Sequence, residues 1–200
     1  MRILFFLLPF FLFANQSIVI DAGHGGADLG TQGRKPYCEE KKMTLQTARL
    51  LKNYLTQLGY RPLLTRSIDT TLTLERRVEI ANKANADLFV SVHFNSARTP
   101  NAKGIEIFFF DSKENRKRAN ASRNLAQSIL TRLVRRTKAA SRGVKKGNFY
   151  VLRQTEMPAV IVEGGFLSNP QELLFLKDPA YLEQIARGIA DGIDAYFRRS

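Results

Sequence analysis

The sequence predicts a single α/β domain in which a mostly parallel sheet is covered by helices on both faces. Three short apolar runs begin at Ile18, Leu88 and Ala159, and runs of this kind, rich in β-branched residues, are typical of buried strands. They alternate with longer segments of helical periodicity, which is the pattern of βαβ units. The length of 200 residues suits one domain with a sizeable core.

The first 14 residues are predicted to be a secretory signal peptide. Met1 and Arg2 form a positive start, the stretch from Ile3 to Phe13 is almost unbroken Leu, Phe and Ile, and Ala14 supplies a small residue before a polar segment. The apolar stretch is shorter than the roughly 20 residues that a membrane-spanning helix needs. An uncleaved anchor or a core strand is the alternative. We expect residues 15–200 to form a domain that is periplasmic or secreted.

The first half of that domain alternates strands and helices. In chain order, we expect a strand at 17–21, a glycine-rich loop to Gly33, a helix from Glu40 to Leu58, a strand from Tyr60 to Thr65, a helix from Thr73 to Ala84 and a strand from Asp87 to Val92. The first helix has apolar residues at helical spacing and ends at Gly59. The second should turn Leu74, Val78 and Ala81 inward.

The second half continues the alternation and ends in helices. We expect a strand from Gly104 to Phe110, a long basic helix from about Arg116 to Thr137, a short strand from Phe149 to Leu152, a strand from Ala159 to Glu163, a helical turn after Asn169 and a final helix from Asp178 to about Phe197. In the basic helix, Ala121, Leu125, Ile129 and Leu133 share one face. Asn169-Pro170 and Asp178-Pro179 are helix-start signals.

The three apolar runs end in residues that can perform chemistry. His24 and His93, the chain's two histidines, follow the first two runs, and Glu163 ends the third. In an open α/β sheet, ligands gather just beyond the carboxyl ends of the strands. Catalytic zinc takes three protein ligands and keeps a position for water. The third ligand must come from elsewhere, and the helix that begins near Glu40 follows the His24 loop.

Two carboxylates compete for that third position at the start of the first helix. Only one of Glu39 and Glu40 can face the sheet edge, and Lys41 and Lys42 are then expected to point away. Glu163 is the remaining carboxylate at a strand end, where it could move a proton.

Each of these residues also has a structural alternative. Histidines at strand ends are often structural, and Glu39 and Glu40 could simply favour a helix N-terminus. Glu163 could cap the loop before Pro170. Gly-His-Gly-Gly could cradle a phosphate, although it lacks the spacing of a dinucleotide or P-loop motif. Spacing alone therefore favours a metal hydrolase without excluding these alternatives.

Charge and cysteine content point to the cell envelope. The single cysteine, Cys38, cannot form an internal disulfide, which fits a bacterial envelope better than a disulfide-stapled extracellular module. The net charge is +13, and twelve Lys or Arg residues but only one acid, Glu114, lie between Lys113 and Lys146. The electrostatic field of so much positive charge attracts polyanions. An anionic wall or membrane surface is the expected partner rather than nucleic acid, and a solvated basic helix face is the alternative.

Several stretches carry a family resemblance in the correct order. They are IVIDAGHGGADLGTQG from Ile18, EKKMTLQTARLLKNYL from Glu40, LTLERRVEIANKANADLFVSVHFNS from Leu72, RGVKKGNFYVLRQTEMPAVIVEGGFLSNPQE from Arg142, and the tail through Ala190-Asp191-Gly192-Ile193. They cover almost all of residues 17–197. The chain resembles the catalytic domain of zinc-dependent N-acetylmuramoyl-L-alanine amidases of the amidase-3 type.

The resemblance implies a set of site residues and a mechanism. It implies His24, Glu40 and His93 as ligands of one Zn²⁺ ion, with Glu40 chosen because the family's Glu-Lys pair falls on Glu40-Lys41. It implies Glu163 as the catalytic residue, which takes a proton from water and returns one to the departing alanine nitrogen. Asn95 is a weaker candidate for orienting substrate. The implied fold is a twisted, mostly parallel sheet of about six strands with helices on both faces.

The partners follow from the same resemblance. We expect residues 15–200 to be a zinc amidase catalytic domain that acts on peptidoglycan as a monomer, with no nucleic-acid partner and no membrane span after signal cleavage. The need for a protein activator is left open, and Cys38, two residues before Glu40, is a minor alternative ligand. The rival functions are a non-catalytic zinc-containing wall-binding protein and a secreted basic polyanion-binding module. We hypothesise that the basic stretch from Lys113 to Lys146 supplies wall affinity.

Overall fold

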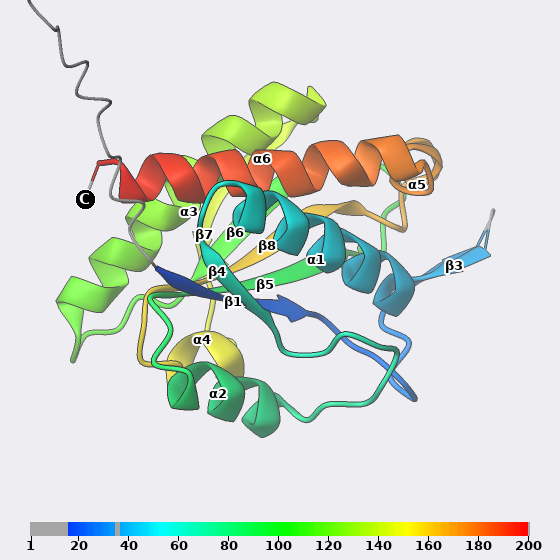
Figure 1. The fold of residues 1–200 in the computed structure, drawn as a ribbon. Helices are drawn as coiled ribbons and strands as arrows, with labels where there is room; N and C mark the ends of the chain where they lie inside the picture. Colours follow the sequence, from blue (N-terminus) through cyan, green and yellow to red (C-terminus); the bar gives the residue numbers. More distant parts are fainter. Residues whose placement is uncertain (1–15, 35–36, 200) are drawn as a thin grey trace, which may run out of the picture.

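A computed structural model describes residues 16–34 and 37–199 (Figure 1). The signal peptide predicted for residues 1–14 lies outside the described residues. Within the described ranges, no helix is both long and apolar enough to span a bilayer. The chain folds as three layers, with a central sheet between helices on either side (Figure 1).

The central sheet has six strands in the order β4-β1-β5-β8-β6-β7. In chain order they are β1 (Ser17–Ala22), β4 (Arg61–Leu64), β5 (Leu88–Asn95), β6 (Ile105–Phe109), β7 (Ser141–Lys146) and β8 (Ala159–Phe166). Strands β4, β1, β5 and β8 are parallel, β6 runs antiparallel to β8, and β7 is parallel to β6. A separate hairpin pairs β2 (Gln32–Arg34) with β3 (Tyr37–Glu39).

The helices divide between the two faces of the sheet. They are α1 (Glu40–Gln57), α2 (Leu74–Lys83), α3 (Arg116–Thr137), α4 (Tyr150–Gln154), α5 (Pro170–Leu176) and α6 (Pro179–Phe197). The larger core lies under α1, α3 and α6 and contains the α3 stripe of Leu125, Ile129 and Leu133. A smaller core lies under α2 and α4, on the opposite face (Figure 1). The predicted fold class is confirmed.

Local signals placed most of these elements correctly. The Asn169 side chain accepts hydrogen bonds from the backbone N–H groups of Gln171 and Glu172 and caps α5, and Asp178 caps α6 in the same way. The predicted helices and the main strands therefore form close to their expected bounds.

Three details of the prediction are wrong. The segment expected as a strand from Phe149 to Leu152 belongs largely to helix α4, which buries Val151 and Leu152 in the smaller core. Leu74 was expected inward but is 50% exposed, and Arg77 is buried in its place. The hairpin and β7 were not predicted, because their polar, glycine-containing sequences lack the apolar runs of buried strands.

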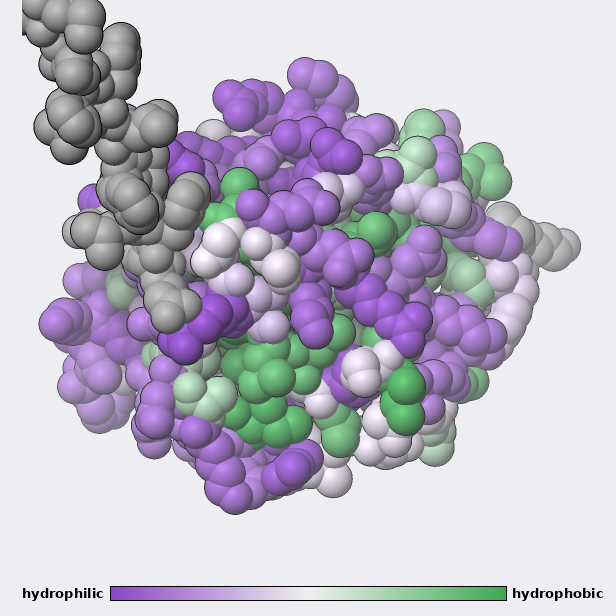
Figure 2. All heavy atoms as spheres, viewed as in Figure 1, coloured by the Kyte–Doolittle hydropathy of each residue, from purple (hydrophilic) through white to green (hydrophobic). Residues whose placement is uncertain are grey.

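The surface on one side of the molecule is mostly hydrophilic (Figure 2). A patch of hydrophobic residues gathers between edge strand β4 and α2 on this side (Figure 2). The chemistry-bearing residues lie elsewhere, at the edge of the sheet where the parallel strands end.

Candidate metal centre

Three side chains distant in sequence meet at the carboxyl edge of the sheet. One ligand atom each of His24, Glu40 and His93 lies within 4.8 Å of the others. The Nε2 atom of His24 is 3.1 Å from Glu40 Oε2, and Nδ1 of His93 is 3.0 Å from Glu40 Oε1. The two imidazole rings stand nearly perpendicular to each other, with centroids 4.8 Å apart. The three predicted ligands therefore share one group.

The strand register aligns three further positions in a row across the sheet. His93 in β5 pairs with Glu163 in β8, and Glu163 pairs with Glu106 in β6. Paired residues project to the same face. By the two-residue period of strands, this is the face that α2 and α4 cover, because Phe89 and Ile161 pack in the smaller core. Glu163 therefore lies between the histidine pair and Glu106.

The strands do not stop at these residues, contrary to the sequence prediction. Strand β5 continues to Asn95, with a register irregularity between His93 and Asn95, and β8 continues to Phe166. His93 and Glu163 thus lie within strands rather than in the loops that follow them. Strand backbone holds them more rigidly than loop backbone would.

The loop that carries His24 is tightly constrained. His24 has a positive φ of 59°, a conformation that costs a non-glycine residue about 1 kcal/mol or more. A Cβ atom on the preceding Gly23 would lie only 2.2 Å from the His93 ring, so only glycine lets the two histidines approach. The Nδ1 atom of His24 lies 2.8 Å from Asp28 Oδ2. That contact fixes which ring nitrogen faces Glu40.

Two buried arginines hold the backbone of this loop. Arg66 donates to the carbonyl oxygens of Ala22 and Gly23, and Arg77 donates to those of Ala22 and His24. Arg77 also forms an ion pair with Asp21. The Asp21 carboxylate accepts further hydrogen bonds from Thr65 and Ser91. The carbonyl groups around His24 are thus satisfied from within the protein, which fixes the strained loop in place.

Glu40 enters the site from the first turn of α1. It is 2% exposed, and its carboxylate accepts hydrogen bonds from the backbone N–H groups of Thr31 and Phe94. Glu39 turns away instead and pairs with Lys42. Lys41 does not point away as predicted: it is buried, donates to the Gly26 carbonyl and pairs with Asp69. The side chain of Lys41 therefore joins α1 to the glycine-rich loop.

The electrostatics of the group follow from burial and from these contacts. Burial alone would lower the pKa of His24, but the hydrogen bond and charge of Glu40, helped by Asp28, raise it to about 9. Burial alone would raise the pKa of Glu40, but His24 and His93 outweigh it and lower the pKa. The pKa of His93 is raised despite burial, chiefly by its hydrogen bond to Glu40. In the metal-free protein the group therefore favours an ionised Glu40 beside a protonated His24, and Glu40 also favours the protonated form of His93.

Glu163 differs from Glu40 in its surroundings. Burial is the largest influence on its carboxyl group and, with the nearby charges of Glu40 and Glu106, raises its pKa to about 7 against the opposing effect of His93. Its Oε2 atom is buried and has no hydrogen-bond partner among the described residues. A carboxyl group that titrates near neutrality can both accept and donate a proton.

The donor set fits a catalytic zinc ion. Two imidazoles and one carboxylate are a usual ligand set for catalytic zinc, which keeps a fourth position for water or substrate. Asp28 supplies the carboxylate that commonly orients a metal-binding histidine. The unpartnered Oε2 of Glu163 beside the group is the position expected for a residue that acts on a reactant rather than on the metal.

Glu106 anchors a charged network on the far side of Glu163. Its carboxylate accepts a hydrogen bond from the Asn95 side chain at 2.7 Å and pairs with Arg142 at 2.7 Å and Lys145. Asn95, expected to orient substrate, is thus held by Glu106, and its role with substrate stays a prediction.

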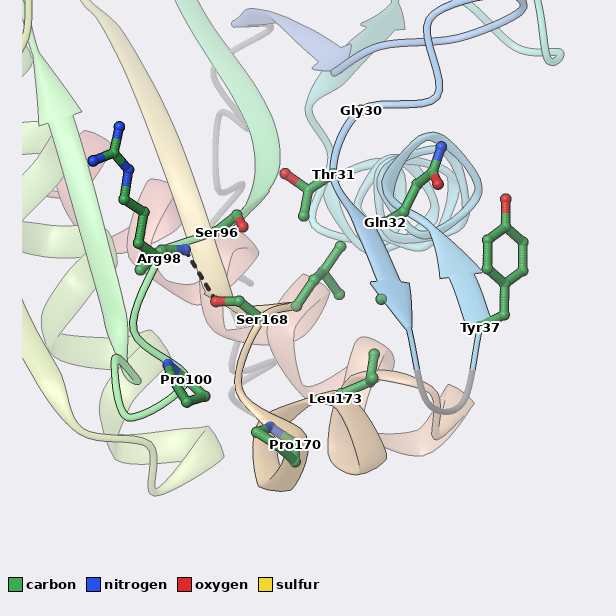
Figure 3. Close-up of a pocket in the computed structure, with 13 residues that line it drawn as sticks. Gly30, Thr31, Gln32, Tyr37, Ser96, Arg98, Pro100, Ser168, Pro170 and Leu173 are labelled. Atoms are coloured by element: carbon green, nitrogen blue, oxygen red, sulfur yellow. Dashed lines mark hydrogen bonds between the residues drawn. The ribbon is translucent and has the colours of Figure 1, made fainter.

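An open pocket of about 880 Å³ lies beside the Gly30-Thr31 segment that contacts Glu40, although neither the three predicted ligands nor Glu163 line it (Figure 3). Gly30 and Thr31 form one wall, and the loops after β5 and β8 form the other, where the Ala97 N–H donates to the Ser168 hydroxyl (Figure 3). Tyr37 of the hairpin lies at its rim (Figure 3). Cys38, the minor alternative ligand, is not in the metal-binding group; its side chain packs near Gly33 and Leu173.

Sequence reasoning missed the residues that support the site. Asp28 lies four residues after His24, and a carboxylate so close to a candidate ligand was the available signal. Arg66 directly follows a predicted strand, but nothing local indicates that it is buried. Arg77 replaces Leu74 on the inward face of α2, and Glu106 interrupts an apolar strand. Both are polar residues at positions where a core residue is expected.

A family model and several relatives match most of this chain in sequence. A family model described as N-acetylmuramoyl-L-alanine amidase matches residues 18–195. The YqiI protein of Bacillus subtilis is 38% identical over 182 residues, which cover 91% of this chain and 85% of YqiI. The probable cell wall amidase LytH of Staphylococcus epidermidis is 33% identical over 91% of this chain, which spans only 58% of LytH.

Solved structures agree with these matches. The catalytic domain of CwlV, an N-acetylmuramoyl-L-alanine amidase from Bacillus (Paenibacillus) polymyxa var. colistinus, is 37% identical with a TM-score of 0.85, covering 92% of this chain and 99% of that domain. The CwlD amidase of Clostridioides difficile, solved in complex with the GerS lipoprotein, is 32% identical with a TM-score of 0.86, covering 93% of this chain and all of that one. Since the family model and both structures cover nearly the whole described fold, this chain belongs to the N-acetylmuramoyl-L-alanine amidase family.

Proposed function

We propose that this protein is a zinc-dependent hydrolase that cleaves the amide bond between N-acetylmuramic acid and the L-alanine of the peptidoglycan stem peptide. The observation that carries the proposal is the meeting of His24, Glu40 and His93 beside the unpartnered carboxyl oxygen of Glu163. His24, Glu40 and His93 would hold one Zn²⁺ ion. A phosphate cradle would need basic groups or free N–H groups here, whereas Glu40 places a negative charge at the centre.

The reaction divides the work between the metal ligands and Glu163. Zinc bound there would polarise the lactyl carbonyl and lower the pKa of a water molecule. Glu163 takes a proton from the attacking water and delivers one to the alanine nitrogen as the C–N bond breaks. The products are a lactyl carboxylate on the glycan and a free amine on the peptide. The pKa of Glu163, raised to about 7 by burial, suits both transfers.

The roles of the two glutamates can be separated by substitution. Glu163→Gln should retain about one zinc per chain and lose at least about 100-fold in turnover, because general acid–base catalysis contributes roughly that much. Glu40→Gln and His24→Ala should lose both metal and turnover. The measurements are metal content of the purified protein and release of stem peptide from purified sacculi, with and without a chelator.

The matched control for Glu40 is its neighbour in the sequence. Glu39→Gln removes the same charge from the same helix start, but Glu39 pairs with Lys42 outside the group, so it should keep zinc and activity. Substantial turnover by Glu163→Gln would exclude the proposed proton transfer. A zinc-free protein with full activity would exclude the metal site.

The cellular setting is part of the same proposal. We propose that residues 1–14 are a signal peptide and that residues 15–200 act as a monomeric domain in the periplasm or outside the cell, on peptidoglycan. CwlD has been solved with a lipoprotein partner, so a protein activator for this chain is a second element to test. Turnover on sacculi by the purified protein alone would show that none is required.

A further inference from the structure

The network around Glu106 carries more positive charge than its buried carboxylate needs. Glu106 is 4% exposed, and one cation would compensate its charge. Two cations, Arg142 and Lys145, pair with the same oxygen, Oε2. With Glu106 ionised, the cluster of these three residues has a net charge of +1. Burial alone would raise the pKa of the Glu106 carboxyl group, but Lys145 and Arg142 outweigh burial and lower it.

The two cations remain partly exposed to solvent. The side chains of Arg142 and Lys145 are 36% and 39% exposed. Arg142 stacks over the Phe166 ring, with its guanidinium carbon 4.9 Å from the ring centroid. Its Nε is committed to Glu106, whereas its Nη2 donates to none of the described residues. A stacked guanidinium with a free donor is oriented to bind an anion at little further entropic cost.

The position of the cluster limits what that anion can be. Glu106 is the direct strand neighbour of Glu163, so their backbones lie about one strand spacing, roughly 5 Å, apart, and both cations gather on the Glu106 carboxylate. A peptide leaving from Glu163 reaches at most about 7 Å in two residues. An anionic group on the first residues of the stem peptide is therefore within reach of the cluster.

We propose that Arg142 and Lys145 bind the free α-carboxylate of the second stem-peptide residue, a D-glutamate that is linked through its γ-carboxyl group. This inference rests on the proposed function and specifies its substrate. In peptidoglycan that α-carboxyl group is either free or amidated. Amidation removes the charge while leaving the size almost unchanged, so the cluster makes the enzyme prefer the free form.

The test compares two soluble peptidoglycan fragments that differ only in whether this α-carboxyl group is free or amidated. The wild-type protein should hydrolyse the free form with a kcat/KM about tenfold higher, as expected for a charge-assisted hydrogen bond. Arg142→Met and Lys145→Met should each reduce the ratio of kcat/KM for the free form to kcat/KM for the amidated form to about threefold or less. The reduction should come mainly from slower hydrolysis of the free form. Arg142→Lys, which keeps the charge, should restore most of the preference.

A neighbouring lysine provides the matched control. Lys146 lies next to Lys145 on β7 but pairs with Asp111 away from Glu106, so Lys146→Met should keep the wild-type ratio.

Equal hydrolysis of both forms by the wild type, or loss of the preference in Lys146→Met as well, would overturn the inference while the proposed function stands. Hydrolysis of sacculi but of neither fragment would also overturn it. Failure on sacculi and fragments alike would overturn the proposed function and this inference together. Unchanged melting temperatures would show that the variants are folded.

Discussion

At the scale of single residues, the proposed zinc ligand His24 holds a proton near neutral pH in the metal-free protein. His24 and Glu40 lie 3.1 Å apart, and the pKa of His24 is raised to about 9. A cation binding among these atoms must displace at least one proton, because metal ligands must be deprotonated. Zinc binding and proton release are therefore coupled.

This coupling predicts how zinc affinity depends on pH. Because the raised pKa keeps His24 protonated below about pH 9, affinity should fall as the pH falls, by about tenfold per pH unit for each proton displaced. Chelator-competition titrations between about pH 8 and about pH 6 would measure the slope. Calorimetry in two buffers of different ionisation enthalpy would count the protons. A zinc affinity that does not change with pH would contradict the hydrogen-bonded state of the group.

Asp28 offers a second test at a single residue. Its carboxylate is 2.8 Å from His24 Nδ1, and such partners typically contribute about 10- to 100-fold to metal affinity. Asp28→Asn should weaken zinc binding by that factor without unfolding the protein, since the side chain is largely exposed. Asp111→Asn, a surface change that breaks ion pairs with Arg116 and Lys146, should leave zinc affinity unchanged. Equal effects of the two substitutions would show that Asp28 has no specific role.

At the scale of elements, the sequence predicted what depends on local signals. Strands β1, β5 and β8 are continuous apolar runs, and α5 and α6 begin at capping residues followed by proline. These features need no knowledge of the tertiary structure. His24 and His93 followed because strands that share a sheet edge bring their carboxyl ends together. Glu40 was chosen over Glu39 only through the family resemblance.

What the sequence did not predict depends on contacts between distant segments. Helix α4 forms in a segment with strand-like composition because Val151 and Leu152 pack in the smaller core beside α2. The burial of Arg77 depends on Asp21, 56 positions away in the chain. Local propensity contains no information about such partners, so the network supporting His24 became visible only in three dimensions.

The buried pair of Arg77 and Asp21 predicts a large effect on stability. Arg77→Met leaves the Asp21 charge without its cation in the interior, which typically costs about 3–5 kcal/mol. The adjacent Arg76 pairs with Glu79 on the surface, so Arg76→Met should cost less than about 1 kcal/mol. Denaturant unfolding of the metal-free protein would measure both. A loss for Arg77→Met as small as that for Arg76→Met would show that Arg77 does not hold the His24 loop.

At the scale of the whole molecule, the site and the basic helix α3 lie on different faces of the sheet. The site opens on the face of the sheet that α2 and α4 cover, whereas the basic helix α3 packs with α6 on the other face (Figure 1). The surface over α3 is hydrophilic (Figure 2). Ion pairs neutralise several of its cations: Arg116 and Lys146 share Asp111, and Arg136 pairs with Asp191.

Other cations of this region are available to a polyanion. Arg123, Arg135 and Lys138 form no ion pair within residues 16–34 and 37–199, so the basic face attracts an anionic wall. Reversing all three charges to Glu should weaken binding to purified sacculi by about tenfold at low salt, and the difference should vanish at high salt, where exposed charges are screened. Hydrolysis of a small soluble fragment should not change, because the site is on the opposite face. Unaltered sacculus binding at low salt would mean that the basic helix is merely a solvated surface.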